Sequence, residues 1–137
     1  MFQDLATELV KVASLLDEAT TLLKTAGKYD HIDFSIPEGV QKAAIRGLEL
    51  RKKFGRGGTH VGMGTARKLS KGGNISPQKV KHISKYFARH AGDNLHKTGR
   101  DGDPPSNGYI AWLLWGGDAG WRWSKKLVRQ INKANEK

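Results

Sequence analysis

The feature that most constrains this chain is the helical spacing of its apolar residues, which clusters of glycine interrupt. Apolar residues at steps of three and four form one face of an amphipathic helix, and glycine after such a run favours a stop. The pattern predicts helices over residues 2–26, 37–54, 64–70, 77–91 and 109–115, and a last helix capped by Asp118. We therefore expect an all-α fold, a compact bundle of about five or six helices with a helix-loop-helix unit and a preceding amphipathic leader helix.

Two segments carry strong local signals. Ser76-Pro77 predicts a helix start, because Ser76 can cap the helix and Pro77 suits its first position. Residues 55–64 contain too many glycines for a regular element, so we expect a flexible basic turn there. This turn matches neither the Walker spacing nor a strand-flanked G-x-G-x-x-G unit. A nucleotide site in the turn stays as an alternative.

Charge changes sign along the chain. Residues 1–34 hold three Lys and six Asp or Glu, a net −3, whereas residues 35–137 hold 21 basic and 7 acidic side chains, a net +14. We predict an acidic amphipathic leader helix over residues 1–27, a linker over 28–36 and a basic helical domain over 37–137. The leader either packs on a partner or is an ordinary core-facing first helix.

The overall composition narrows the class of partner. A formal net charge of +11 on 137 residues attracts polyanions, of which nucleic acid is the leading candidate. Solubility, ribosome-like packing and basic drift are the alternatives. The chain has no Cys, which excludes disulfides and thiolate metal sites. No stretch approaches the ~20 apolar residues of a membrane span, so we expect no membrane partner.

The helix over residues 77–91 is the most informative part of the basic domain. Val80, Ile83 and Phe87 would anchor one face, while the other carries donors for phosphates and base edges. A helix that enters a DNA groove needs both faces. With the end of the second helix and the glycine-rich loop, the candidate nucleic-acid-binding residues are Arg51, Lys52, Lys53, Arg56, His60, Arg67, Lys68, Lys71, Lys79, Lys81, His82, Lys85 and Arg89.

Residues 64–91 resemble a helix-turn-helix unit with one countable difference. Such units place a small residue of the first helix about ten positions before an aliphatic residue of the second. The equivalents here, Ala66 and Val80, are fourteen positions apart. The turn is too long, and a looser helix-loop-helix is the better description. The alternative is a pair of core helices with a solvated basic face.

The four tryptophans fall between Trp112 and Trp123. Aromatic faces stack single-stranded bases, but Trp112 and Trp115 lie in the most apolar run of the chain and favour core packing. Trp123, beside Arg122, is the best candidate for stacking.

We expect no enzymatic activity, no metal site and no cofactor. The five histidines lack the H-E-x-x-H spacing of a zinc helix, and carboxylates after residue 34 are few and scattered. The alternative is a small metal-dependent nuclease that uses Asp101 and Asp103 with His90 or His96.

Several strings in residues 39–123 carry a family resemblance. They are LELRKK at 48–53, GRGGT at 55–59, ISP at 75–77, YFARH at 86–90, AW at 111–112 and WGGDAG at 115–120. On these strings the segment resembles a small uncharacterised basic helical module of tailed-bacteriophage proteins. The module carries no known activity, so the resemblance transfers no catalytic residue.

The leader residues 8–13 are also similar to the starts of many phage proteins. This implies the first alternative, ahead of the nuclease: a virion structural or minor capsid protein whose basic surface contacts other subunits or packaged DNA. Its leader helix would reach phage structural proteins. Our leading prediction is a non-enzymatic DNA-binding protein, with DNA a better fit than RNA, located in host cytoplasm or in the virion.

Overall fold

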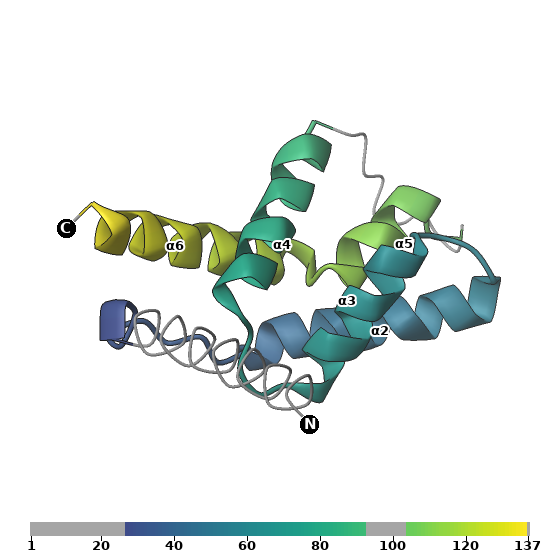
Figure 1. The fold of residues 1–137 in the computed structure, drawn as a ribbon. Helices are drawn as coiled ribbons and strands as arrows, with labels where there is room; N and C mark the ends of the chain where they lie inside the picture. The colour runs from purple at the N-terminus through teal and green to yellow at the C-terminus, as the bar shows by residue number, and fades with distance from the viewer. Residues whose placement is uncertain (1–26, 93–103, 137) are drawn as a thin grey trace, which may run out of the picture. The chain divides into compact units, whose positions relative to one another are not determined.

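The computed structural model describes residues 27–92 and 104–136. These residues form five α-helices (Figure 1) and no β-strand, apart from one isolated bridge between Ser35 and Asn74. In chain order the helices are α2 (Glu38–Phe54), α3 (His60–Lys71), α4 (Pro77–His90), α5 (Asn107–Leu114) and α6 (Gly117–Asn135). They confirm the all-α fold predicted from the sequence. The predicted leader helix over residues 2–26 lies outside the described residues.

The described chain falls into two parts. The larger runs from residue 34 to residue 130 and holds α2 to α5 and most of α6. Residues 27–33 and 131–136 belong to the smaller part, where the Tyr29 hydroxyl donates to Oδ1 of Asn135 at 2.8 Å. No residue from 29 to 37 is helical, yet Ile32 and Ile36 are buried. The domain boundaries expected from the sequence stay predictions.

In the larger part, α2 packs against α3 and α5 (Figure 1). α2 and α5 approach closely at Gly47, where a Cβ atom would lie 2.7 Å from the backbone nitrogen of Leu114. Only glycine leaves room for this approach. α2 ends at Gly55, whose φ of +65° breaks the helix and whose N–H donates to the Arg51 carbonyl at 2.8 Å.

The glycine-rich segment is more regular than the sequence predicts. The expected turn over residues 55–64 was wrong at its second half, because α3 begins at His60. Thr59 caps the helix, and its Oγ1 accepts a hydrogen bond from the Gly62 N–H at 3.2 Å. Gly62 is buried against Trp115, since a Cβ atom there would lie 3.1 Å from the indole Nε1. Packing on a large ring therefore explains this glycine inside a helix.

α4 begins where the sequence predicts. The Ser76 Oγ accepts a hydrogen bond from the Lys79 N–H at 3.1 Å, and Pro77 takes the first helical position. Aromatic rings join α4 to the helices that follow it. Phe87 lies edge-on to Trp112 of α5, with ring centroids 4.7 Å apart, and stacks on Trp121 of α6 at 6.3 Å.

The predicted buried helix corresponds to α5, in which Ile110 and Leu114 are fully buried. Gly116, with a φ of +115°, turns the chain from α5 into α6. Asp118, expected as the cap of the last helix, instead lies one residue inside α6. Its Oδ1 accepts a hydrogen bond from the indole Nε1–H of Trp112 at 2.8 Å. This bond ties the start of α6 to α5.

Candidate nucleic-acid interface

Residues 50–92 contain no Asp or Glu and carry a large share of the positive charge. They span the end of α2, the turn after it, α3 and α4. The eleven Lys and Arg of this acid-free segment are Arg51, Lys52, Lys53, Arg56, Arg67, Lys68, Lys71, Lys79, Lys81, Lys85 and Arg89. Without local carboxylates their potentials add.

These eleven cations form no ion pair with any residue in the described ranges. The Lys42–Glu38 pair at 3.0 Å and the Arg46–Glu49 pair at 3.4 Å both lie on α2, ahead of the acid-free segment. The packing of the described residues therefore leaves the charge of the segment available to an external anion.

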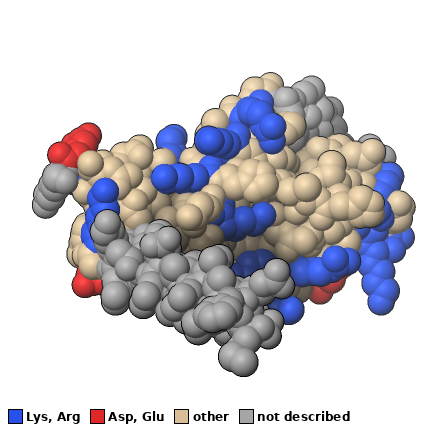
Figure 2. All heavy atoms as spheres, in the orientation of Figure 1, with Lys and Arg blue, Asp and Glu red and all other residues tan. Residues whose placement is uncertain are grey.

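α4 presents one basic stripe to solvent. His82, Lys85 and Arg89 are exposed, and their spacing of three and four residues places them along one face of the helix. Lys81 lies beside this stripe and is half-buried. Figure 2 shows Lys and Arg side chains over α4 and, below it, over α3. The exposed face of α4 therefore carries the charges of Lys85 and Arg89, with His82 in the same row.

α3 carries a second basic stripe. His60, Arg67 and Lys71 are exposed, and spacings of seven and four residues place them on the outer face of the helix. Lys68 is also exposed. It follows Val61 by seven residues, two helical turns, and therefore lies on the same side of α3 as Val61. The opposite face of α3 is buried.

The basic residues at the end of α2 form a separate group, at the right edge of Figure 2. Lys52 and Lys53 are exposed, whereas Arg51 is half-buried and its Nε finds no hydrogen-bond partner among the described residues. The Arg56 guanidinium donates to Oδ1 of Asn107 at 2.6 Å, so it links the turn to the start of α5. The structure thus places most of the predicted residues of α3 and α4 on exposed faces of their own helices, and the α2 group at a separate edge.

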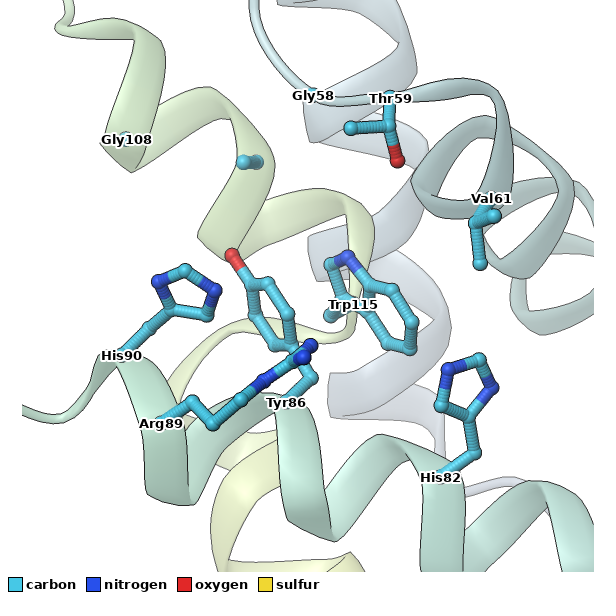
Figure 3. Close-up of a pocket in the computed structure, with 10 residues that line it drawn as sticks. Gly58, Thr59, Val61, His82, Tyr86, Arg89, His90, Gly108 and Trp115 are labelled. Atoms are coloured by element: carbon cyan, nitrogen blue, oxygen red, sulfur yellow. The ribbon is translucent and has the colours of Figure 1, made fainter.

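A pocket of about 390 Å³ lies between the start of α3, the part of α4 from His82 onward, and α5 (Figure 3). α4 lines it with His82, Tyr86, Arg89 and His90. Val61 stands on the facing wall, and Trp115 lies between the two walls. Residues 72–76 join α3 to α4, so this α3–α4 pocket lies at the end of the helix pair away from the connection.

Trp115 is held by other side chains on its ring. Tyr86 stacks on it with centroids 4.4 Å apart and planes 7° apart, and His82 meets it edge-on at 5.0 Å. Lys79 Nζ lies 5.3 Å from the ring centroid. These neighbours leave no free face for a stacked base. The burial of Trp112 and Trp115 confirms the core packing predicted for them, while Trp123 is half-buried on α6.

The pKa of His82 lies below its ordinary value. Partial burial is the first cause, and the positive charges of Lys79, Arg89 and Lys85 add to it. Burial also lowers the pKa of Lys79. The three cations make the potential on this side of the pocket positive, and a positive potential attracts an anion.

Sequence reasoning did not single out Tyr86, Val61 and Trp115 as parts of a site. Tyr86 had a local signal, because it lies four residues after His82 and four before His90 on the same side of α4. Val61 and Trp115 had none. They join the site only through the packing of α3 and α5 in three dimensions.

No family model, curated protein or solved structure matches the chain. None of the helices in the described ranges is long and apolar enough to cross a membrane. Residues 27–92 and 104–136 also hold no group of three or more His, Asp or Glu side chains that could bind a metal ion. Asp101, Asp103 and His96, on which the nuclease alternative depends, lie outside the described residues.

Proposed function

We propose that this protein is a non-enzymatic nucleic-acid-binding protein that uses the basic stripes of α3 and α4. One observation carries the proposal: the eleven cations of the acid-free segment have no ion-pair partner among the described residues. Phosphate contacts from Lys and Arg supply most of the non-specific affinity of such proteins. The virion and nuclease alternatives stay predictions.

Duplex DNA is the better partner on geometric grounds. An α-helix with its side chains is about 10–12 Å wide and enters the major groove of B-DNA, which is about 12 Å wide. The major groove of an RNA duplex is too narrow for side chains to read. α4 is a 14-residue helix whose apolar face is anchored and whose basic face is exposed, which suits insertion into the wider groove.

The test is a duplex-binding titration at two salt concentrations. For the unchanged protein, affinity should fall as salt rises, with a log–log slope of about −0.9 for each phosphate contacted. The triple variant Lys81→Ala, Lys85→Ala, Arg89→Ala should bind at least about tenfold more weakly. Its affinity should also depend less on salt, with a log–log slope that is less negative by about 2–3. A duplex RNA of the same sequence should bind more weakly than the DNA.

The matched control removes the same charge elsewhere. Lys125, Lys126 and Arg129 are exposed on α6, and their replacement by Ala also removes two Lys and one Arg. This variant should retain most of the affinity. Equal losses in the two triple variants would show attraction by net charge alone, and the absence of duplex binding at low salt would refute the proposal.

A further inference from the structure

The α3–α4 pocket presents a hydrogen-bond donor, the indole Nε1–H of Trp115, to solvent. Trp115 is 4% exposed, and its indole Nε1–H has no hydrogen-bond partner among the described residues. Trp112, at 3% exposed, donates the same group to Asp118. In Figure 3 the ring nitrogen of Trp115 lies on the edge toward Gly58 and Thr59, so an acceptor that enters the pocket would meet it.

The other polar groups of the pocket favour the same kind of ligand. Arg89 brings donors and a positive charge, and the Thr59 hydroxyl, whose oxygen already accepts from the Gly62 N–H, keeps its proton to donate. Within residues 27–92 and 104–136, no Asp or Glu lines the pocket. A ligand made of acceptor oxygens and negative charge satisfies these groups, and a phosphate group has this chemistry.

The size and the walls of the pocket indicate more than a bare phosphate. Its volume of about 390 Å³ is near the lower end of the range for organic ligands. Val61 and Ala111 supply apolar lining. These features suit a phosphate ester that places its charged group at the donors and its organic part against the apolar wall.

We propose that the α3–α4 pocket binds the terminal phosphate of a nucleic-acid strand together with the nucleotide that carries it. A terminal phosphate monoester has a charge of about −1.5 to −2 near pH 7, more than a diester inside the strand, and only one side of it continues into the chain. The positive potential around Arg89 therefore favours the strand end. The inference rests on the proposed function for the source of the phosphate.

The first experiment compares three forms of one short DNA duplex by fluorescence anisotropy at fixed salt. One form carries 5′-phosphates, one carries 3′-phosphates, and one has hydroxyls at all ends. At least one phosphorylated form should bind about tenfold more tightly than the hydroxyl form, as charge-assisted hydrogen bonds to the phosphate predict. The preferred form identifies which strand end enters the pocket.

Three variants separate the pocket from general charge. Arg89→Gln should reduce the phosphate preference to about twofold or less. Val61→Phe should do the same without any change in charge, because Val61 is 52% exposed and a larger ring there fills the pocket without entering the core. Lys85→Gln is the control. Lys85 is exposed one turn before Arg89 and does not line the pocket, so all three duplexes should weaken together.

The second experiment observes the indole N–H directly by ¹⁵N–¹H NMR. Each of the four tryptophans gives one indole signal, and the signal lost in Trp115→Phe identifies Trp115. Addition of deoxyadenosine 5′-monophosphate should shift this signal, whereas deoxyadenosine without phosphate should not. The Trp112 signal should remain in place, because its N–H already donates to Asp118.

The outcomes distinguish this inference from the proposed function. If the three duplexes bind equally and the Trp115 signal does not move with the mononucleotide, the pocket assignment is overturned, although binding of hydroxyl-ended DNA would still support the proposed function. If the mononucleotide shifts the Trp115 signal and no duplex binds, the pocket assignment holds for a free nucleotide and the proposed function fails.

Discussion

Gly47 is the residue at which the packing of α2 on α5 is most sensitive to change. Gly47→Ala would place a Cβ atom 2.7 Å from the Leu114 backbone nitrogen, and a backbone atom cannot move aside as a flexible side chain can. The helices must separate. We expect the free energy of unfolding, measured by urea denaturation, to fall by about 1–3 kcal/mol.

Gly64 provides the matched control for this substitution. It also lies inside a helix, but a Cβ atom there would meet nothing within 4 Å. Gly64→Ala should therefore raise the free energy of unfolding by about 0.5–1 kcal/mol, because alanine loses less backbone entropy than glycine on folding. A loss of stability in both variants would show that helix contact at Gly47 is not the cause.

His82 should titrate below the ordinary histidine pKa in an NMR titration. Lys85→Gln removes one of the three cations that lower this pKa, so the pKa should rise toward its ordinary value. The effect on stability has a definite sign. As the pH falls through the ordinary value, the unfolded chain takes up a proton before the folded protein does, so stability falls until the folded pKa is passed.

The control for His82 is Lys125→Gln, which removes an exposed charge on α6. This change should leave the His82 pKa where it is in the unchanged protein. The groups around His82 are Lys79, Lys85 and Arg89 on its own helix and Trp115, the residue that follows α5. An equal rise in both variants would mean that the potential at His82 comes from the whole chain.

At the scale of the element, the start of α4 depends on Ser76. Its Oγ accepts the hydrogen bond of the Lys79 N–H at 3.1 Å, so Ser76→Ala leaves a helix donor without its cap. We expect a loss of about 1 kcal/mol in chemical denaturation. Ser84→Ala, inside the same helix, is the control and should be neutral or slightly stabilising, because alanine has the higher helix propensity.

The sequence predicted those helices whose signals are local. Ser76-Pro77 marked the start of α4, and the apolar run from residue 109 marked α5. The start of α3 was missed because its glycines looked incompatible with a helix. Position 62 favours glycine because Trp115, 53 positions later, packs where a side chain would be, and no local pattern contains that information.

The candidate site divides in the same way. The basic stripe of α4 followed from helical spacing and the apolar positions of the same helix, so the sequence alone located it. The α3–α4 pocket did not follow, because its walls come from α3, α4 and α5, whose packing is set by long-range contacts. The sequence also could not show that the Trp115 N–H has no acceptor among the described residues. Trp112, three residues earlier in the same apolar run, does have one.

At the scale of the whole molecule, a net charge of +11 opposes folding through self-repulsion. Salt screens this repulsion, with a Debye length of about 10 Å at 0.1 M. We expect the thermal midpoint to rise by a few degrees as sodium chloride increases from about 20 mM to about 200 mM, a change that corresponds to about 1 kcal/mol. Differential scanning fluorimetry measures it.

The acid-free segment determines the sign of this salt effect, because its cations have no attractive pairs for salt to weaken. The control is a triple variant that replaces Arg67, Lys68 and Lys71 with Gln. With fewer repulsive charges it should respond less to salt. A thermal midpoint that falls with salt in the unchanged protein would mean that attractive pairs dominate.

The same lack of carboxylates affects how copies of the protein meet one another. Two molecules that approached through their α3 and α4 surfaces would bring only like charges together, with no acidic side chain on either surface to form a bridge. Self-association through the basic faces of α3 and α4 is therefore disfavoured, so contacts between copies do not bury these faces even when the protein is concentrated.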